Sequence, residues 1–492
     1  MSERRPLTAD GRRSPDWLQY GIVGAILLLY LVTGSLYAIY TPDWQAPDEP
    51  AHYNYIRQLA EGRLPVIEAA DYDQAYIEQV LDSGFDPQYS LESFRYEDWQ
   101  PPLYYLLQTP IYLLADGSLV ALRLFSVLLG GGVVWLAYLV AQQLFPARPW
   151  LALGVAIFVA FLPQHLAILA SVNNDSLAEL LIAGILLSLV QMVAVPRFGS
   201  VRDHNLAKDV FLVGLLLGLG FLTKGTVYLM APVVGFALLT RYWKQWKALL
   251  KALLLAFVPA FMLGALWWGR NLMVYDGLDI LGKAAHDAVV VGQPRTAEWL
   301  AQHGLAGTIG RFLQTTFTSF WGQFGWMALP LRGWTFQIVL VLSLLALLGL
   351  LLSRGELETR DYGSTLPRRL GDWETGRLET GDREIGRLKG QGSLGTWLPV
   401  GRRWSAVILL LTFILTMGLH IWYNLTFVQH QGRYLFPALI PIATGVVVGL
   451  AFWLRLLTRR WTAAGYLLPF GLALILLPLA WYSLFRIIVP GL

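Results

Sequence analysis

Acidic side chains gather between residues 41 and 102, where thirteen aspartates and glutamates stand against three arginines. The stretch opens on Asp48-Glu49 and closes on Glu97-Asp98. A carboxylate placed against a reacting hydroxyl can accept its proton, and carboxylates also bind hard divalent cations. Asp48, Glu49, Glu97 and Asp98 are therefore the candidate catalytic residues of the chain.

The residues after Asp48 have the spacing of a short helix. On such a helix His52 shares a face with Asp48, and Tyr53 shares a face with Glu49. The simpler alternative for Asp48 is a helix cap, because acidic side chains favour helix starts. A metal site built from Asp48, His52 and Asp98 is a further hypothesis. No fixed ligand spacing demands Mg²⁺ or Mn²⁺, so a divalent cofactor is left open.

Three cations stand in or beside apolar segments, at Lys224, Arg270 and Arg433. Lys224 interrupts a long apolar run, and a cation buried there needs a partner, either a phosphate or an internal carboxylate. For Arg270 and Arg433 the simpler alternative is a side chain that reaches back to the membrane interface. Convergence of the three cations on one face would suit a lipid-linked phosphate.

Further polar residues at the ends of apolar runs are additional site candidates. They are Gln100, Asn174, Asp175 and His430, together with His52 and Tyr53. Asn174 and Asp175 connect two apolar runs, where a turn followed by a helix cap is a sufficient structural explanation.

The composition predicts that membrane helices position these residues. The mean hydropathy is +0.50, with 55% hydrophobic and 14% charged residues. The chain contains no cysteine, which excludes disulfides, thiolate metal sites and cysteine nucleophiles. A helix needs roughly 20 apolar residues to cross a bilayer, so the apolar runs predict an all-α polytopic protein with about eleven spans. These lie near residues 17–40, 119–145, 150–170, 176–195, 210–223, 226–240, 247–268, 334–352, 404–424, 434–454 and 463–486.

The distribution of basic residues predicts the orientation. Segments assigned to the inner side carry most of the lysines and arginines between spans, whereas the acidic loop falls on the outer side. By the positive-inside rule the N-terminus is cytoplasmic and the candidate site faces the outside of the plasma membrane. The pI of 9.1 reflects these inner loops, so we predict membrane lipids rather than nucleic acid as the surroundings of the chain.

The domain organisation follows from the same runs. We predict a cytoplasmic tail at 1–16, a transmembrane core at 17–352 that includes an outer loop at 41–118, a flexible cytoplasmic insertion at 353–403, and C-terminal transmembrane helices at 404–492. The insertion is rich in glycine and in charges of both signs and has little to bury, which favours a linker.

Two apolar segments on the outer side are predicted to lie at the membrane surface. Residues 103–115 follow the proline pair Pro101-Pro102 and are too few to span the bilayer. Residues 304–326 are rich in aromatic side chains and carry Arg311. We expect both segments to form interfacial helices.

Short motifs occur in a fixed order over residues 15–450. They are Asp48-Glu-x-x-x-Tyr53, an acid before Pro101-Pro-Leu-Tyr-Tyr105, Ala121-Leu-Arg123-Leu-Phe-Ser126, Asn173-x-Asp175, Leu222-Thr-Lys224-Gly225, Trp268-x-Arg270-Asn271 and Gly432-Arg433-Tyr434-Leu-Phe-Pro437. Their order resembles that of the GT-C membrane glycosyltransferases, which include the protein O-mannosyltransferases and the aminoarabinose transferase acting on lipid A. The sequences of Phe320–Trp326 and Gln431–Tyr434 resemble even more closely those of a bacterial family of membrane proteins in the same superfamily.

The resemblance implies a GT-C fold and an extracytoplasmic hexosyltransferase. Such an enzyme moves a sugar from a polyprenyl-phosphate donor to an acceptor, with inversion at the anomeric carbon. By similarity Asp48 is the general base or a metal ligand, and Glu49 is its neighbour. The second carboxylate of the site is Glu97 or Asp98.

The resemblance also assigns roles to the cations. Lys224, Arg270 and Arg433 would hold the phosphate of the donor. The chain departs from the O-mannosyltransferases at Gln100, where they have a histidine, so their mechanism does not transfer unchanged.

Three other functions fit the same residues. A flippase or transporter for a lipid-linked glycan would use the same cations, although transporters usually show repeated halves with broken helices at the midplane. A ligase that moves a whole glycan from a lipid pyrophosphate is a second alternative. A non-catalytic relative that binds a polyprenyl lipid is a third. The acceptor is open among glycan, lipid and protein.

Overall fold

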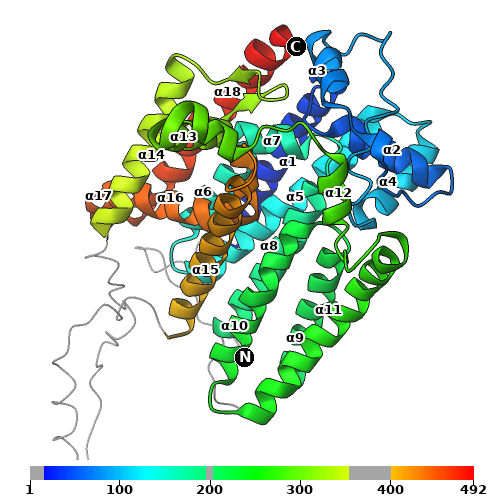
Figure 1. The fold of residues 1–492 in the computed structure, drawn as a ribbon. Coiled ribbons are helices and arrows are strands. Elements are labelled where there is room, and N and C mark those ends of the chain that lie inside the picture. Colours follow the sequence, from blue (N-terminus) through cyan, green and yellow to red (C-terminus); the bar gives the residue numbers. More distant parts are fainter. Residues whose placement is uncertain (1–15, 195–202, 354–399) are drawn as a thin grey trace, which may run out of the picture.

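The computed structural model describes residues 16–194, 203–353 and 400–492. Within them the chain is a bundle of helices (Figure 1), and its strands are one short antiparallel pair, β1 (Gln323–Phe324) and β2 (Leu329–Pro330). The predicted all-α class is confirmed. The predicted tail at 1–16 and insertion at 353–403 lie, except for their edges, outside the described residues.

Eight helical segments among the described residues are long and apolar enough to cross a membrane. They are built on α1 (Asp16–Tyr40), α5 (Leu119–Leu144), α8 (Asp175–Ala194), α11 (Trp246–Val274), α14 (Trp334–Leu352), α15 (Val400–Asn424), η5 with α16 (Gly432–Ala438, Leu439–Trp453), and the run η6, α18, η7 and α19 (Thr462–Tyr466, Leu467–Tyr482, Ser483–Ile488, Val489–Gly491). The short helix α17 (Arg455–Arg460) follows α16.

A ninth candidate span is bent. The helices α6 (Pro149–Phe161) and α7 (Pro163–Leu169) meet at 62°. Leu162 between them is extended, because a residue before proline is driven out of the helical region. The predicted number of eleven is not confirmed: the two shortest predicted spans correspond to α9 (Asp203–Phe221) and to η2 with α10 (Gly225–Leu229, Met230–Tyr242).

Small residues let neighbouring helices pack closely. A Cβ on Gly214 would lie 2.3 Å from the Ala256 carbonyl oxygen, which explains how α9 and α11 run side by side in Figure 1. A Cβ on Gly449 would lie 2.0 Å from the Ala346 carbonyl oxygen at the contact of α16 with α14. Such contacts drive helix association in a bilayer, where apolar surface alone does not.

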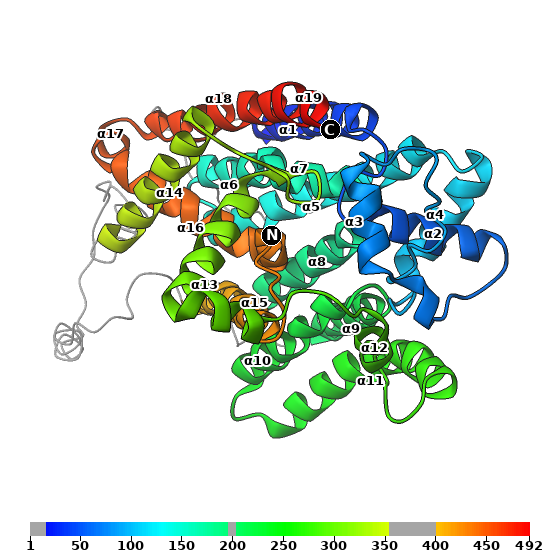
Figure 2. The same ribbon diagram turned by 45° about the horizontal axis from the view of Figure 1, so that its top comes forward.

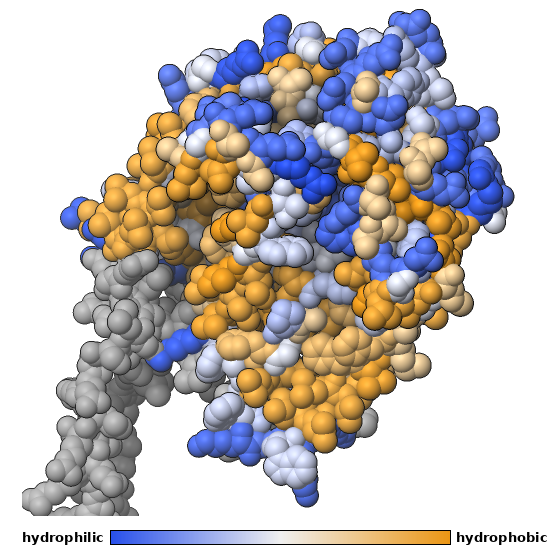
Figure 3. Space-filling view, in the orientation of Figure 1, coloured by the Kyte–Doolittle hydropathy of each residue, from blue (hydrophilic) through white to orange (hydrophobic). Residues whose placement is uncertain are grey.

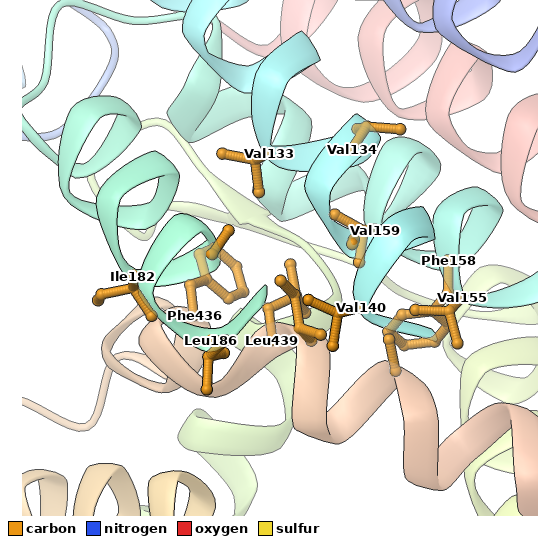
Figure 4. Close-up of a cluster of buried hydrophobic side chains, with 14 of the residues drawn as sticks. Val133, Val134, Val140, Val155, Phe158, Val159, Ile182, Leu186, Phe436 and Leu439 are labelled. Carbon is orange, nitrogen blue, oxygen red and sulfur yellow. The ribbon is translucent and has the colours of Figure 1, made fainter. Parts of the chain in front are cut away.

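The centre of the bundle is apolar. Valines of α5 and α6 pack there with Ile182 and Leu186 of α8 and with Phe436 and Leu439 (Figure 4). The helices α1 and α18 lie alongside each other in Figure 2, and Tyr37 donates a hydrogen bond to the Ala480 carbonyl at 2.7 Å. Helices from the C-terminal part of the chain therefore pack against the first helix.

Several helices that are not candidate spans gather at one end of the bundle, which we term the loop face. They are α2 (Glu49–Ala60), η1 (Ala69–Asp71), α3 (Gln74–Asp82), α4 (Leu103–Leu114), α12 (Lys283–Val289) and α13 (Thr296–Trp321). Hydrophilic residues cover the part that carries α2 and α3, above an apolar flank (Figure 3). Both predicted interfacial segments are helical. However, α13 begins eight residues earlier than predicted, passes a kink at Gly304, and ends at Trp321, before the β1–β2 turn.

Candidate active site on the loop face

Asp48 lies between α1 and α2 and pairs with a residue from the far end of the chain. Its Oδ2 accepts a hydrogen bond from Arg433 Nη2 at 2.5 Å, and its Oδ1 accepts one from the Tyr96 hydroxyl at 3.1 Å. Asp48 stands at the cap position of α2 with a φ of 67°, but its carboxylate makes no capping bond. The simple capping explanation therefore does not account for its side chain.

Glu97 is the second carboxylate of this group. Burial and the nearby Asp48 carboxylate together raise its pKa to about 7, against the opposing effects of Lys224, a hydrogen bond with Gln100, and Arg433. Its Oε2 atom is buried and has no hydrogen-bond partner within the described residues. Glu97 is therefore close to its midpoint of protonation at neutral pH and has an oxygen free for a further partner.

Asp48 titrates in the opposite direction. Burial alone would raise its pKa, but the positive charges of Arg433 and Lys224, together with His52, hold the pKa below its ordinary value. Asp48 is therefore ionised at neutral pH. Because the same cations act on both carboxylates, Asp48, Glu97, Lys224 and Arg433 form one electrostatic group, which we term the charge cluster.

Lys224 enters the charge cluster from the break between α9 and η2. Its Nζ lies 2.7 Å from Asp175 Oδ1, at the first turn of α8. Of the two partners expected for a cation in this position, the internal carboxylate is the one present. The side chains of Lys224 and Asp175 are 16% and 20% exposed, so a ligand can still reach this pair.

Buried polar groups lie beneath the charge cluster. His52 Nδ1 is 2.8 Å from the Tyr105 hydroxyl, and burial together with Lys224 lowers the pKa of His52 to about 3, so its ring is neutral. The Asn174 amide nitrogen is 3.3 Å from the same hydroxyl and 3.4 Å from Gln100 Oε1. The predicted residues His52, Gln100 and Asn174 are thus brought together by Tyr105, which the sequence did not single out.

Glu49 lies outside the charge cluster, although it follows Asp48 in sequence. It is fully buried and forms two bonds with Arg123 of α5, at 2.8 Å to Nε and 2.6 Å to Nη2. Arg123 also donates to the carbonyls of Ala38 and Thr41, and the Val172 amide donates to Glu49. The geometry gives Glu49 an anchoring role and does not support the predicted catalytic one.

Tyr53 is likewise structural in position, since its hydroxyl donates to the Gly117 carbonyl at 2.9 Å. It shares with Glu49 the face of α2 that packs on the bundle, as the helical spacing predicted. Arg123 was visible only as part of a motif. Its charge inside an apolar helix was the signal that could have identified it.

Asp98 is also separate from the charge cluster. Its Oδ2 accepts from Gln58 at 2.8 Å, and burial, with some contribution from Asp71, raises its pKa to about 8. No three His, Asp or Glu side chains among the described residues are placed to hold one metal ion. The hypothetical ligand set of Asp48, His52 and Asp98 is therefore not assembled, and of the two closing acids it is Glu97 whose pKa depends on Asp48, Lys224 and Arg433.

Two predicted site residues, Arg270 and His430, lie elsewhere on the loop face. Arg270 donates to Asn271 at 2.9 Å and to the Pro65 carbonyl, and its guanidinium covers the ring of Trp267. His430 packs against Phe312 of α13 with ring centroids 5.4 Å apart. Neither residue is among the main causes of the pKa shifts of Asp48 and Glu97. His430 is close to Arg433 only in the sequence.

Comparison with known sequences finds one family match. Residues 99–268 match the family described as dolichyl-phosphate-mannose-protein mannosyltransferase. This range contains Asn174, Asp175 and Lys224 of the site and the anchor Arg123. The match covers 170 of the 492 residues and agrees with the predicted resemblance.

Several solved structures of other proteins show a distant similarity to the chain. The Saccharomyces cerevisiae O-mannosyltransferase complex Pmt1–Pmt2, bound to its sugar donor, is 17% identical over 52% of this chain and 34% of that one, with a TM-score of 0.39. The Archaeoglobus fulgidus oligosaccharyltransferase is 13% identical over 91% and 53%, with a TM-score of 0.44. ArnT from Cupriavidus metallidurans, bound to undecaprenyl phosphate, is 16% identical over 94% and 78%, with a TM-score of 0.37.

The chain thus spans about a third and about half of the length of the first two of these proteins. A comparison with curated proteins finds no match.

Proposed function

We propose that the chain transfers a sugar from a polyprenyl-phosphate donor to an acceptor hydroxyl on the outer face of the plasma membrane. The observation that carries this proposal is the charge cluster. Two carboxylates and two cations from four separate segments meet on the loop face, and one carboxylate oxygen lacks a partner among the described residues. The match of residues 99–268 to the dolichyl-phosphate-mannose-protein mannosyltransferase family supports the reaction class.

Arg433 and Lys224 can exchange their carboxylate partners for the phosphate of a donor. Without a donor, each is neutralised by a carboxylate, Arg433 by Asp48 and Lys224 by Asp175. A donor phosphate offers both cations a shared partner and several acceptor oxygens. Binding would therefore draw Arg433 from Asp48 and leave that carboxylate ionised beside the bound sugar.

The chemical step is a single displacement. Asp48 accepts the proton of the acceptor hydroxyl, and the acceptor oxygen forms a bond to the anomeric carbon. The bond from that carbon to the phosphate oxygen breaks, and its electron pair leaves with the lipid phosphate. Lys224 and Arg433 stabilise the charge that grows there. Glu97, partly protonated in the free protein, adds less repulsion toward the phosphate than a fixed anion would.

The test is reconstitution in liposomes with a radiolabelled polyprenyl-phosphate hexose. We expect the wild type to release label from the lipid and Asp48→Asn to do so about 10²–10⁴-fold more slowly, the range for loss of a general base. Asp82→Asn is the matched control, since Asp82 is an exposed carboxylate on α3 of the same loop.

Three outcomes would count against the proposal. If Asp48→Asn consumes donor as fast as wild type, Asp48 is not the base. If no donor is consumed while the lipid crosses the bilayer, the protein is a flippase. If both aspartate variants slow the reaction equally, the effect comes from folding.

A further inference from the structure

A second group of polar side chains lies on the loop face, between α13 and the segment that follows α15. The Arg311 guanidinium covers the ring of Trp299 at 4.4 Å, and the Trp299 ring also lies 4.4 Å from that of His303. His430 approaches from the other side through Phe312, with ring centroids 5.4 Å apart. None of these residues is needed for the reaction proposed above.

Three polar atoms here are buried and lack a hydrogen-bond partner within the described residues. They are Trp299 Nε1, His430 Nδ1 and Gln431 Oε1. The His430 side chain is only 4% exposed. A buried polar group without a partner costs about 1–3 kcal/mol, so several of them in one place point to a ligand that completes them.

The charge of this group is positive. Arg311 is exposed, and within the described part of the chain no carboxylate lies at ion-pair distance from it. Its guanidinium therefore keeps most of its hydrogen-bond donors. Together with the indole N–H of Trp299 it offers the donor-rich surface that a phosphate group requires.

The helix that carries Arg311 and Trp299 fixes the depth of the site. Leu305, Ile309 and Leu313 follow at intervals of four residues and are 66%, 48% and 60% exposed. Residues with this spacing form one stripe on a helix, and an apolar stripe of this kind lies in the hydrocarbon at a membrane surface. The polar side of α13 is then at the level of the phospholipid head groups.

We propose that Trp299, Arg311 and His430 bind the head group of an anionic phospholipid, at a site separate from Lys224 and Arg433. The phosphate would accept bonds from Arg311 and from the indole of Trp299. Gln431 would accept a bond from a head-group hydroxyl, which favours a lipid such as phosphatidylglycerol over one without hydroxyls. The acyl chains would lie along the stripe of α13.

The test measures lipid binding, and it needs neither donor nor catalysis. The full chain, purified in a non-ionic detergent, is titrated by calorimetry with dihexanoyl phosphatidylglycerol. Dihexanoyl phosphatidylcholine serves as the zwitterionic lipid and glycerol 3-phosphate as the free head group. We expect phosphatidylglycerol to bind at least about tenfold more tightly than either, because the choline cation of phosphatidylcholine is repelled by Arg311 and glycerol 3-phosphate lacks the acyl chains that lie along α13.

Arg311→Gln should weaken that binding about tenfold, and Trp299→Phe, which keeps the ring and loses the N–H, about fivefold. Arg295→Gln is the matched control. Arg295 also stands at α13 and also covers an aromatic ring, that of Phe427, at 4.4 Å. Its replacement should change binding less than twofold.

The proposal is overturned if Arg311→Gln and Arg295→Gln weaken binding equally, or if phosphatidylcholine binds as tightly as phosphatidylglycerol. Equal affinity for glycerol 3-phosphate would show a site for a free anion, and displacement of the lipid by a glutamate-rich peptide would show a protein-binding surface. A failure of sugar transfer leaves this result unaffected, so the two proposals fail separately.

Discussion

Asp48 and Glu49 are adjacent in sequence, and each pairs with an arginine. The two pairs nevertheless differ in their burial and in the hydrogen bonding of the arginine. Glu49 and Arg123 are 0% and 1% exposed, and backbone carbonyls take the remaining donors of the arginine. Asp48 and Arg433 are 22% and 8% exposed, and Arg433 Nε has no partner within the described residues. We term Glu49–Arg123 the closed pair, because every side-chain nitrogen of Arg123 has a partner. We term Asp48–Arg433 the open pair, because Arg433 Nε has none among the described residues. A satisfied pair fixes the fold, whereas an incompletely satisfied one can exchange its partner for a ligand.

The largest effect is expected at the closed pair. Arg123→Met leaves Glu49 buried and unpaired, which should lower the free energy of unfolding by about 3–5 kcal/mol. Thermal unfolding in detergent measures the loss. Arg57→Met is the control, because Arg57 forms only exposed ion pairs with Glu61 and Glu92, and its replacement should cost under about 0.5 kcal/mol. Equal losses would contradict the distinction between closed and open pairs.

The open pair should respond in ligand binding instead. Arg433→Gln is expected to weaken donor binding about 10–100-fold, since it removes a charge-assisted contact to phosphate. Equilibrium binding of a labelled polyprenyl-phosphate hexose provides the measurement, with Arg270→Gln as the comparison. If Arg270→Gln weakens binding as much as Arg433→Gln, the donor phosphate lies nearer to Arg270 than the charge cluster places it.

The third effect is a pH dependence. Burial raises the pKa of Glu97 to about 7, so the folded protein holds a proton that the unfolded chain has released above its ordinary pKa of 4.5. The stability that this proton contributes is present at low pH and is lost as the pH rises from about 4.5 through 7. Glu97→Gln should therefore flatten the fall in melting temperature between about pH 5 and 8. An unchanged slope would place the titration on another group.

The smallest effect is expected at Asp98. Its pKa of about 8 keeps it largely neutral at pH 7, and it bonds to Gln58 away from the charge cluster. Asp98→Asn should change the rate of sugar transfer less than about threefold, well below the loss expected for a general base. A loss similar to that of Asp48→Asn would return Asp98 to the site as the second carboxylate.

The sequence predicted the fold class, most spans and Asp48, Lys224 and Arg433 as candidate site residues. These features can be read locally, from the length of an apolar run or from a charged residue within or beside one. It could not separate Asp48 from Glu49 by role. That separation depends on whether Arg123 or Arg433 reaches each carboxylate, which is a property of packing between distant helices. The sequence left the second carboxylate open between Glu97 and Asp98 for the same reason, since successive residues in a non-helical loop face different neighbours.

The predicted number of eleven spans is not confirmed, and the difference lies in the segments on either side of Lys224. The break at Lys224 leaves α10 with thirteen residues, too few to cross the hydrocarbon by themselves, and apolar composition alone does not record that length. The position of α13 was displaced because Gly304 permits a kink within one helix, where the sequence suggested a helix start.

The separation of the paired residues along the chain also sets an order in time. Arg123 follows Glu49 by 74 residues, whereas Arg433 follows Asp48 by 385. At a synthesis rate of about 5–20 residues per second, the closed pair can form within roughly 4–15 s of the emergence of Glu49, and the open pair only after roughly 20–80 s. The anchor of the loop is thus complete long before the charge cluster, so a nascent chain holds its loop in place without a finished site. The proposed site is complete only once η5, which carries Arg433, has been synthesised.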